Sequence, residues 1–533
     1  MTIYINDYIS PDASDSAAAV RKAVDDAKRL GADELHFGRG TYALTSSVSI
    51  ETDQSAHDAG AKLTAEKAVL LYFKDFENFT ISGEVDENGE PATILAGINT
   101  LELHSIQPSI LWCEGCKNLT VRNLAFTRAP EFASAGRVET VDGGHITVRV
   151  SDGCPCYDGM GTHCMNRFTP DGEMIYESLS YGPGLGTTFR LIGDRLLSID
   201  SDRLSGKLKP GDLISWHQGA QTDFQCYFGR TENLRLSNLR TYNSNGFAMI
   251  AFECHGIKAD RMIFKPRGNQ LFTAPRDAWK LHKCSGKIEN SRFYVEGVRM
   301  DGQNVHNNYM FVKEKLSDSS IIIASDNAKV DFSTSGGADS EIEFFREEKS
   351  IGKAMLSGYK HLSTSIEGGK TVQYYRFDFN EPLGFDCGGT LALADCFTPE
   401  FYHCHDSEFY NVAGAGHLMR ISHLLIENCR YKNMMNAGIM LGAEFPTHHE
   451  GGNCEDAVIR DCVFDNCGFA ARYGTVGCIG VNSSGFSTAV NHNIRIENCE
   501  FRNSDVGVDL HCAYDVRIRN CRYENLGEDI RLS

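Results

Sequence analysis

One pattern of apolar and polar positions recurs towards the C-terminal end of the chain. It appears at residues 424–431, 457–464, 494–501 and 516–523. Each copy alternates apolar and polar residues, then has Asn or Asp, then Cys, and then an aromatic residue two positions after the Cys. The alternation predicts a short β-strand with one buried face, and the Asn or Asp that follows predicts a corner. Weaker copies occur at residues 119–126, 234–239 and 257–264.

The copies return at a nearly constant interval. Asn498 to Asn520 is 22 residues, and so is Asn238 to Asp260. A short strand that returns at this interval is typical of a parallel β-helix, in which each strand stacks on its equivalent in the next coil. Because stacked strands lie about 4.8 Å apart, we expect ladders of like residues along the solenoid. The predicted fold class is all-β: a right-handed parallel β-helix with an N-terminal cap helix and two inserted small β subdomains.

Residues 12–30 are the segment with helical periodicity. Apolar residues recur there at helical spacing, at Ala19, Val20, Ala23, Val24 and Ala27. Asp15 or Ser16 is placed to cap this helix, and Gly31 is placed to end it. An amphipathic helix in this position would cover the open edge of the first coil, whose first strand we expect at residues 35–37.

The repeat is interrupted twice. From about residue 138 to 216, and again from about 311 to 395, the pattern of strand and corner is lost. Alternating segments inside both windows predict small β subdomains inserted between coils. The chain therefore divides into the cap helix and first coils at 1–137, an inserted subdomain at 138–216, central coils at 217–310, a second inserted subdomain at 311–395, and C-terminal coils at 396–533.

Composition and charge narrow the class of partner. The chain has 533 residues, of which 41% are apolar and 23% are charged, and its net charge is -19. The excess of acidic residues argues against nucleic acid or an anionic membrane surface as a partner. No stretch approaches the roughly 18 apolar residues of a membrane span.

The cysteines and the N-terminal residues indicate in which cellular compartment the protein is expected. The chain has 19 cysteines, and Cys429, Cys462, Cys499 and Cys521 fall at interior ladder positions. The N-terminus shows no basic segment followed by an apolar one. Reduced thiols in the cytoplasm are therefore expected rather than a disulfide framework, and a secreted form whose leader has been removed stays open. The last coil has no capping helix, so we expect a loop or a second copy of the chain, as in a homodimer, to cover its edge.

Residue types that bind metals gather in the first interruption. Cys154, Cys156, His163 and Cys164 fall within eleven residues, and Cys and His are zinc ligands. The Cys-x-Cys spacing and the adjacent His-Cys pair match no standard zinc motif. Neither a metal site nor a cofactor is therefore predicted.

The candidate chemistry lies in the central coils. Asp277 and Asp301 are 24 residues apart, about one coil, so their backbones are expected to stack about 5 Å apart. Two carboxyls held this close raise the pKa of one of them and provide a proton donor and a base, as hydrolysis of a glycosidic bond requires. The alternative is that both cap turns on a solvated face. Which of the two is the acid stays open.

Other polar residues of this region suit a sugar ligand. We expect substrate contacts from Arg276, Lys280, Asn304, His306 and Glu450, because such side chains can hydrogen-bond to hydroxyl groups. Trp279 is a candidate apolar platform, with plain packing as the alternative. His306 lies five residues after Asp301, and an odd separation along a strand points to opposite faces, so a turn at Gly302 has to bring it to the groove. Glu450 is expected on a loop between two later coils.

The order of these parts resembles glycoside hydrolase family 110. The resemblance covers most of the chain and includes the cap helix, residues 211–214, Asp277-Ala278 with Cys284-x-Gly286, Asp301 with Asn304-Val305-His306-x-x-Tyr309, the loop at Glu450, and residues 493–498. Members of the family are β-helical, exo-acting enzymes that remove terminal α-1,3-linked galactose with inversion, which implies an oligosaccharide or glycan as the partner. The resemblance implies that Asp277 is the first catalytic Asp of the family and that Asp301 is the second member of its Asp-Asp pair.

The chain departs from the family at three places. Met300 stands where the family has the first Asp of the pair, Lys280 stands where His is expected, and residues 412–416 lack the usual arginines. The leading hypothesis is an inverting, exo-acting glycosidase for α-galactoside-like sugars. Two others stay open: a polysaccharide lyase or glycosyl-transferring β-helix enzyme, for which Lys280 and Arg276 are candidate basic groups, and a β-helix that binds carbohydrate without turning it over.

Overall fold

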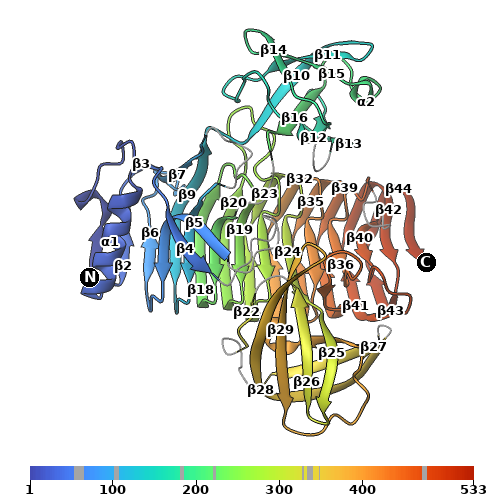
Figure 1. The fold of residues 1–533 in the computed structure, drawn as a ribbon. Helices are drawn as coiled ribbons and strands as arrows, with labels where there is room; N and C mark the ends of the chain where they lie inside the picture. Colours follow the sequence, from blue (N-terminus) through green and yellow to red (C-terminus); the bar gives the residue numbers. More distant parts are fainter. Residues whose placement is uncertain are drawn as a thin grey trace.

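The repeated segments form parallel strands that stack along one axis into a solenoid (Figure 1). The computed structural model describes residues 1–52, 65–100, 107–180, 185–219, 224–326, 329–332, 340–346, 349–470 and 477–532. Coil strands from β17 (Phe224–Gly229) to β44 (Arg522–Leu532) pair in parallel with their equivalents in the neighbouring coils. The predicted parallel β-helix is confirmed.

The four clearest copies of the repeat lie in register. They form β34 (Leu424–Glu427), β38 (Glu455–Arg460), β41 (Asn491–Glu497) and β43 (Ala513–Arg519). Ile426 pairs with Ile459, and Ile459 pairs with Ile496; all three are fully buried. The apolar positions of the alternation therefore line the interior of the solenoid, and the polar positions face outwards.

The Asn or Asp after each strand forms the corner of the coil. Asn428, Asp461, Asn498 and Asn520 have φ angles of 51° to 54°, in the left-handed region that Asn and Asp enter more readily than other L-residues. Their side chains also stack: the amide of Asn498 donates to Asp461 Oδ1 at 3.1 Å, and that of Asn520 donates to Asn498 Oδ1 at 3.4 Å. Backbone conformation and the ladder together explain why these residue types recur.

The thiols fill the interior next to these corners. All 19 cysteines are free. Cys156, Cys512 and Cys521 are half-buried, and the others are buried. The structure thus has the interior thiols that the repeat predicts, with Cys acting as a small apolar filler.

The N-terminal helix α1 (Ala17–Leu30) covers the first coil (Figure 1). Its buried stripe contains Ala17 in place of the predicted Ala19, together with Val20, Ala23, Val24 and Ala27. The helix begins after Ser16, one of the two predicted cap positions, so residues 12–15 of the predicted segment precede it. The carboxylate of Asp15 accepts hydrogen bonds from the N–H groups of both Ala17 and Thr45, each at 3.0 Å. These bonds tie the segment before the helix to the neighbouring coil in a non-helical conformation.

The first strand also comes earlier than predicted. β1 (Thr2–Tyr4) pairs in parallel with β2 (Glu34–His36), so the chain has already begun the sheet before it enters the helix. Within the described part of the chain, no helix has the length and apolar character needed to cross a lipid bilayer.

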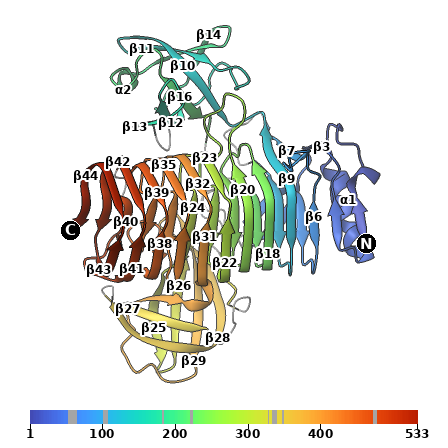
Figure 2. The same cartoon turned by 180° about the vertical axis from the view of Figure 1, so that it is seen from behind.

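Two subdomains leave the solenoid on opposite sides (Figure 2). The first is a seven-stranded sheet in the order β13-β12-β16-β10-β11-β15-β14, with antiparallel neighbours. Its strands are β10 (Ala133–Asp142), β11 (His145–Val150), β12 (His163–Phe168), β13 (Met174–Ser180), β14 (Arg190–Gly193), β15 (Leu196–Asp200) and β16 (Leu213–His217).

The second subdomain is a closed barrel in the order β25-β26-β29-β28-β27-β30. Its strands are β25 (Met310–Ser317), β26 (Ser320–Asp326), β27 (Glu341–Arg346), β28 (Lys349–Glu367), β29 (Lys370–Phe379) and β30 (Leu391–Ala394). The coil strand before the barrel, β24 (Gln303–Asn308), pairs directly with β33 (His417–Arg420) after it. The barrel therefore interrupts the sequence repeat but leaves the ladder of coil strands intact.

Aromatic side chains form a stack inside the C-terminal coils. Phe409, Tyr431, Phe464, Phe501 and Tyr523 follow one another with ring centroids 4.8 to 5.3 Å apart and planes 5° to 12° apart. Phe464, in the middle, is fully buried, whereas Tyr523 in the last coil is half-buried. Burial of such rings is a large stabilising contribution.

We expect Phe464→Ala to lower the free energy of unfolding by about 3–5 kcal/mol, the range observed when a buried Phe is truncated. Tyr523→Ala is the matched control in the same stack and should be less destabilising, because its ring is partly exposed. Urea unfolding followed by circular dichroism measures both variants. Equal losses of stability in the two would contradict this account of the stack.

Candidate active site

Three neighbouring coil strands present two rows of outward side chains. β21 (Trp279–His282), β24 and β33 pair in parallel. This register places Lys280, Asn304 and Leu418 in one row, and His282, His306 and Arg420 in the next. The alternate residues Trp279, Leu281, Val305 and Met419 belong to the interior core. Trp279 is therefore packing inside the solenoid and not a platform for a ligand.

Asp277 and Asp301 stack one coil apart, just before β21 and β24. The N–H of Ala278 donates to the carbonyl of Asp301 at 3.0 Å, and the N–H of Asp301 donates to Asp277 Oδ1 at 3.3 Å. Both residues are buried, with exposed fractions of 3% and 5%. The spacing of 24 residues thus brings the two carboxyls into one site.

Each carboxyl is held by its own donors. Asn304 Nδ2 donates to Asp277 Oδ2 at 3.2 Å, and the N–H of Ala415 donates to Asp301 Oδ1 at 2.8 Å. Burial raises the pKa of Asp277 above its ordinary value, against the opposing charges of Lys280 and Arg276 and with a further increase from Glu450. Asp277 is therefore biased towards its protonated form.

A glycine lets the next coil approach this pair. A Cβ on Gly414 would lie 2.4 Å from the carbonyl oxygen of Met300 and 2.5 Å from Asp301 Oδ1, which no side chain allows. The segment at residues 412–416, where the sequence lacks arginines, instead supplies backbone: the N–H of Gly414 donates to the Met300 carbonyl at 3.0 Å. Small residues here bring main-chain donors to the Asp301 carboxylate.

Glu450 lies in a short strand and not on the predicted loop between two later coils. It forms the two-residue strand β37 (Glu450–Gly451), which pairs antiparallel with the end of β24, and only 6% of its surface is exposed. The loop folds back because the end of β24 offers backbone partners next to Asn308. The strand carries Glu450 over the two outward rows of side chains.

Two cations, Lys280 and Arg420, and the imidazole of His306 face the Glu450 carboxylate. Lys280 Nζ lies 4.0 Å from Glu450 Oε1, His306 Nε2 lies 3.6 Å from the same atom, and Arg420 Nε lies 3.5 Å from Oε2. Burial opposes ionisation of Glu450, but the charges of Lys280 and Arg420, helped by nearby histidines, outweigh it and hold the pKa of Glu450 below its ordinary value. Glu450 is therefore biased towards its charged form, in contrast to Asp277.

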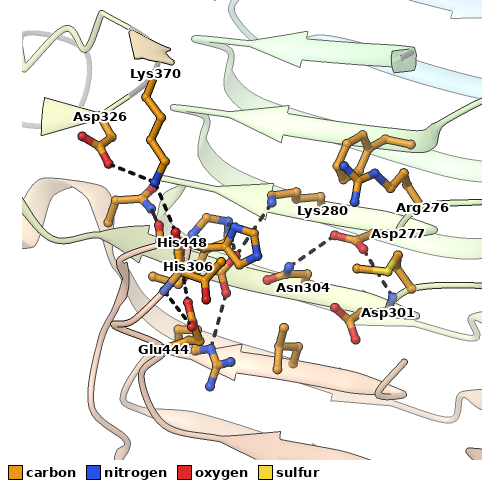
Figure 3. Close-up of a pocket in the computed structure, with 17 residues that line it drawn as sticks. Arg276, Asp277, Lys280, Asp301, Asn304, His306, Asp326, Lys370, Glu444 and His448 are labelled. Carbon is orange, nitrogen blue, oxygen red and sulfur yellow. Dashed lines mark hydrogen bonds and ion pairs between the residues drawn. The ribbon is translucent and has the colours of Figure 1, made fainter. Parts of the chain in front are cut away.

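These residues line one cavity of about 280 Å³ (Figure 3). The structure brings all seven predicted site residues to its walls: Arg276, Asp277, Lys280, Asp301, Asn304, His306 and Glu450. Residues that the sequence did not single out complete the lining, among them Phe247, Asn308, Asp326, Lys370, Arg420, Glu444 and His448. Arg420 could have been found by extending the ladder of His306 across the barrel, but nothing in the sequence places the barrel residues Asp326 and Lys370 here.

The Cys and His residues of the first insertion do not gather into one cluster in the structure. In the ranges that the structure describes, no group of three or more His, Cys, Asp or Glu side chains converges as metal ligands do. Cys154 instead packs in the apolar core of the seven-stranded sheet, where burial raises the pKa of its thiol to about 11.

Comparisons with known proteins give one family model and a set of relatives. The model, described as "Right handed beta helix region", matches residues 385–522. "Alpha-1,3-galactosidase B" of Phocaeicola vulgatus is 25% identical over 272 residues, which are 49% of this chain and 44% of that protein. "Alpha-1,3-galactosidase A" of Streptomyces avermitilis is 22% identical over 539 residues, covering 93% of this chain and 82% of that protein. Among solved structures, an exopolygalacturonase from Thermotoga maritima has a TM-score of 0.40 at 10% identity and covers 100% of this chain and 91% of that one.

The family model confirms the predicted handedness of the β-helix. The similarity to the Phocaeicola vulgatus enzyme spans less than half of the length of that protein, whereas the similarity to the Streptomyces avermitilis enzyme extends over most of both chains. The resemblance to glycoside hydrolase family 110 is confirmed by these relatives, at the identity of a divergent member.

The close approach at Gly414 predicts a local packing requirement. Gly414→Ala should lower the free energy of unfolding by about 1–3 kcal/mol, the usual range for overpacking, because the added methyl meets backbone and a buried carboxylate. Gly206→Ala is the control, since a Cβ there meets nothing within 4 Å, and its stability should be unchanged or slightly higher. Chemical denaturation measures both variants. An unchanged free energy of unfolding in Gly414→Ala would show that the neighbouring coil shifts to make room for the methyl group.

Proposed function

We propose that this chain is a glycoside hydrolase that removes a terminal α-galactoside-like sugar, with α-1,3-linked galactose as the leading substrate, and that it acts with inversion. One observation carries the proposal: two buried carboxyls, Asp277 and Asp301, stack one coil apart in a polar cavity, and the pKa of Asp277 is raised. Pairs of carboxyls placed in unlike environments are the means by which glycosidases separate an acid from a base. The names of the relatives agree with this chemistry.

Asp277 is assigned as the acid. Burial raises the pKa of Asp277 and so favours its protonated form. The protonated carboxyl donates its proton to the glycosidic oxygen as the bond from that oxygen to the anomeric carbon breaks. Asp301 is assigned as the base, because the Ala415 N–H fixes its carboxylate. It takes a proton from the water that adds to the anomeric carbon, so that the products are the free sugar and the leaving-group alcohol.

The cavity is suited to one hydroxyl-rich ring. Asn304 Oδ1 and Arg420 Nε are buried without a hydrogen-bond partner among the described residues, and the hydroxyls of a sugar both donate and accept. Nitrogen atoms of Lys280, His306 and Arg420 lie 3.5 to 4.0 Å from the carboxylate oxygens of Glu450. These distances are longer than hydrogen bonds, so sugar hydroxyls can bridge the nitrogens and the oxygens. A cavity of about 280 Å³ lies at the small end of ligand pockets, roughly 300–1,000 Å³, which favours a single terminal sugar and exo action.

The nature of the product tests the proposal. Incubation with an α-1,3-linked galactosyl oligosaccharide should release free galactose, and proton NMR during the first turnovers should show the β-anomer. An unsaturated product would indicate a lyase instead, and binding without any product would indicate a carbohydrate-binding β-helix.

Replacement of either carboxyl should remove the activity but not the fold. We expect Asp277→Asn and Asp301→Asn each to lower kcat by roughly 10²- to 10⁴-fold, the usual contribution of general acid–base catalysis. Asp318→Asn is the control, because that carboxyl lies on the exposed surface of the barrel, 3.0 Å from Lys315. Steady-state kinetics with circular dichroism on the same samples makes the comparison. Full activity in both Asn variants would end the assignment.

The pH profile should respond in opposite directions to two neighbours of Asp277. Activity falls as pH rises through the pKa of the acid, because Asp277 then loses the proton that it donates. The charge of Lys280 lowers this pKa and that of Glu450 raises it. Lys280→Met should therefore move the basic limb of kcat/KM to higher pH, and Glu450→Gln should move it to lower pH. If the basic limb moved in the same direction in the two variants, Asp277 would be excluded as the acid.

A further inference from the structure

One end of the cavity is built by the inserted barrel and not by the solenoid. Asp326 ends strand β26 and Lys370 begins strand β29, and both line the cavity. In Figure 3, Asp277 and Asp301 lie at one end of the site and Asp326 and Lys370 at the other. A sugar held between the two ends would meet the solenoid at its scissile bond and the barrel at its far side.

The space between the two ends is enclosed and polar. Lys280, Asn304 and His306 lie along it (Figure 3). Glu450 also lines the cavity, and each of these four residues is at most 6% exposed. The row runs in the direction of strands β21 and β24, from the residues before each strand towards its end. A ring that reacts at Asp277 and Asp301 therefore presents its remote hydroxyls to the barrel.

The barrel is fixed to the loop that carries Glu450. Lys370 Nζ donates to the carbonyl of Thr447 at 3.2 Å and lies 3.8 Å from Asp326 Oδ2. Asp326 Oδ2 is in turn 2.8 Å from His449 Nδ1. These contacts close the end of the cavity with three segments that are far apart in the sequence.

Buried polar contacts also fix the barrel to the solenoid. The N–H of Asp331 donates to Glu253 Oε1 at 3.2 Å, and the same carboxylate lies 2.9 Å from Arg230 Nε. Asn307 Nδ2 donates to the carbonyl of Ala394 at 3.0 Å. Arg230 and Glu253 lie at corners of the coils and Asn307 lies in β24, so these bonds hold the barrel against the coils that carry the site.

We propose that Lys370 determines specificity by donating a hydrogen bond to a hydroxyl of the terminal sugar that is remote from the scissile bond. An ammonium group has three N–H donors. Thr447 takes one, and the Asp326 oxygen at 3.8 Å is too far away for a hydrogen bond. The Lys370 side chain is 49% exposed and lines the cavity, so a ligand can reach it. This inference rests on the proposed function, and it moves part of the sugar recognition from the solenoid to the barrel.

The test compares variants on a matched set of substrates. The substrates are para-nitrophenyl α-galactoside and its analogues in which one hydroxyl at a time is replaced by hydrogen. Lys370→Met should lower kcat/KM on the parent by roughly 10- to 100-fold, as expected for a lost hydrogen bond to a charged group. On the analogue that lacks the contacted hydroxyl, the kcat/KM values of the variant and of the unmodified protein should differ by less than about threefold, because the hydrogen bond is already absent.

Two further variants separate recognition from structure. Lys370→Arg keeps a positive donor and should retain most of the discrimination between the parent and that analogue. Lys360→Met, on the exposed face of strand β28 of the same barrel, should leave all rates unchanged. Thermal unfolding of each variant checks that the barrel remains folded.

Each outcome bears on one hypothesis. Lys370→Met could lower kcat/KM by the same factor on the parent and on every analogue, or leave it unchanged on all of them. Either result would show that Lys370 does not hydrogen-bond to a sugar hydroxyl. If the unmodified protein hydrolyses no α-galactoside at all, it is the proposed function that fails.

Discussion

Register between stacked coils is the constraint on which the rest of this molecule depends. Parallel hydrogen bonding fixes which residue of one coil lies against which residue of the next, so a side chain is placed by its position in the ladder and not by its neighbours in sequence. Asp277 and Asp301 meet because the N–H of Ala278 bonds to the carbonyl of Asp301. The same register aligns His306 with Arg420, although the whole barrel lies between them in the chain.

Register also explains why the site tolerates so many buried charges. An isolated charge in the interior is strongly unfavourable, and removal of one partner from a buried pair is costly. Here the ladder delivers Lys280, His306 and Arg420 to one carboxylate, Glu450, which stays ionised despite its burial. Burial raises the pKa of Asp277, in contrast, against the opposing charges of Lys280 and Arg276, and the charge of Glu450 raises it further. One scaffold thus creates two unlike environments for carboxyls within a single cavity.

The sequence predicted the repeating coils, the cap helix and the two insertions, but it did not show how the second insertion and the late loop meet the site. The repeat of about one coil in 22 to 24 residues was enough to place Asp277 beside Asp301 and to explain the corners at Asn428 and Asn498, because those positions follow from periodicity. Glu450 was expected on a loop between two later coils, since no local pattern shows that a two-residue strand will pair with the end of β24. Lys370 and Asp326 lie in alternating strands like any others, and only the closure of the barrel brings them to the site. Trp279 was ambiguous until the alternation on β21 assigned it to the interior.

The direct pairing of β24 with β33 has a consequence for how such a site can change. Because the coil before the barrel bonds to the coil after it, the barrel can vary without displacing Asp277, Asp301 or the Ala415 N–H that holds Asp301. The groups assigned to bond cleavage therefore belong to the rigid ladder, whereas the wall opposite them belongs to an insertion. Chemistry and substrate choice are carried by different parts of the chain, and this separation lets a solenoid keep its acid and base while the ring that it accepts is altered from outside.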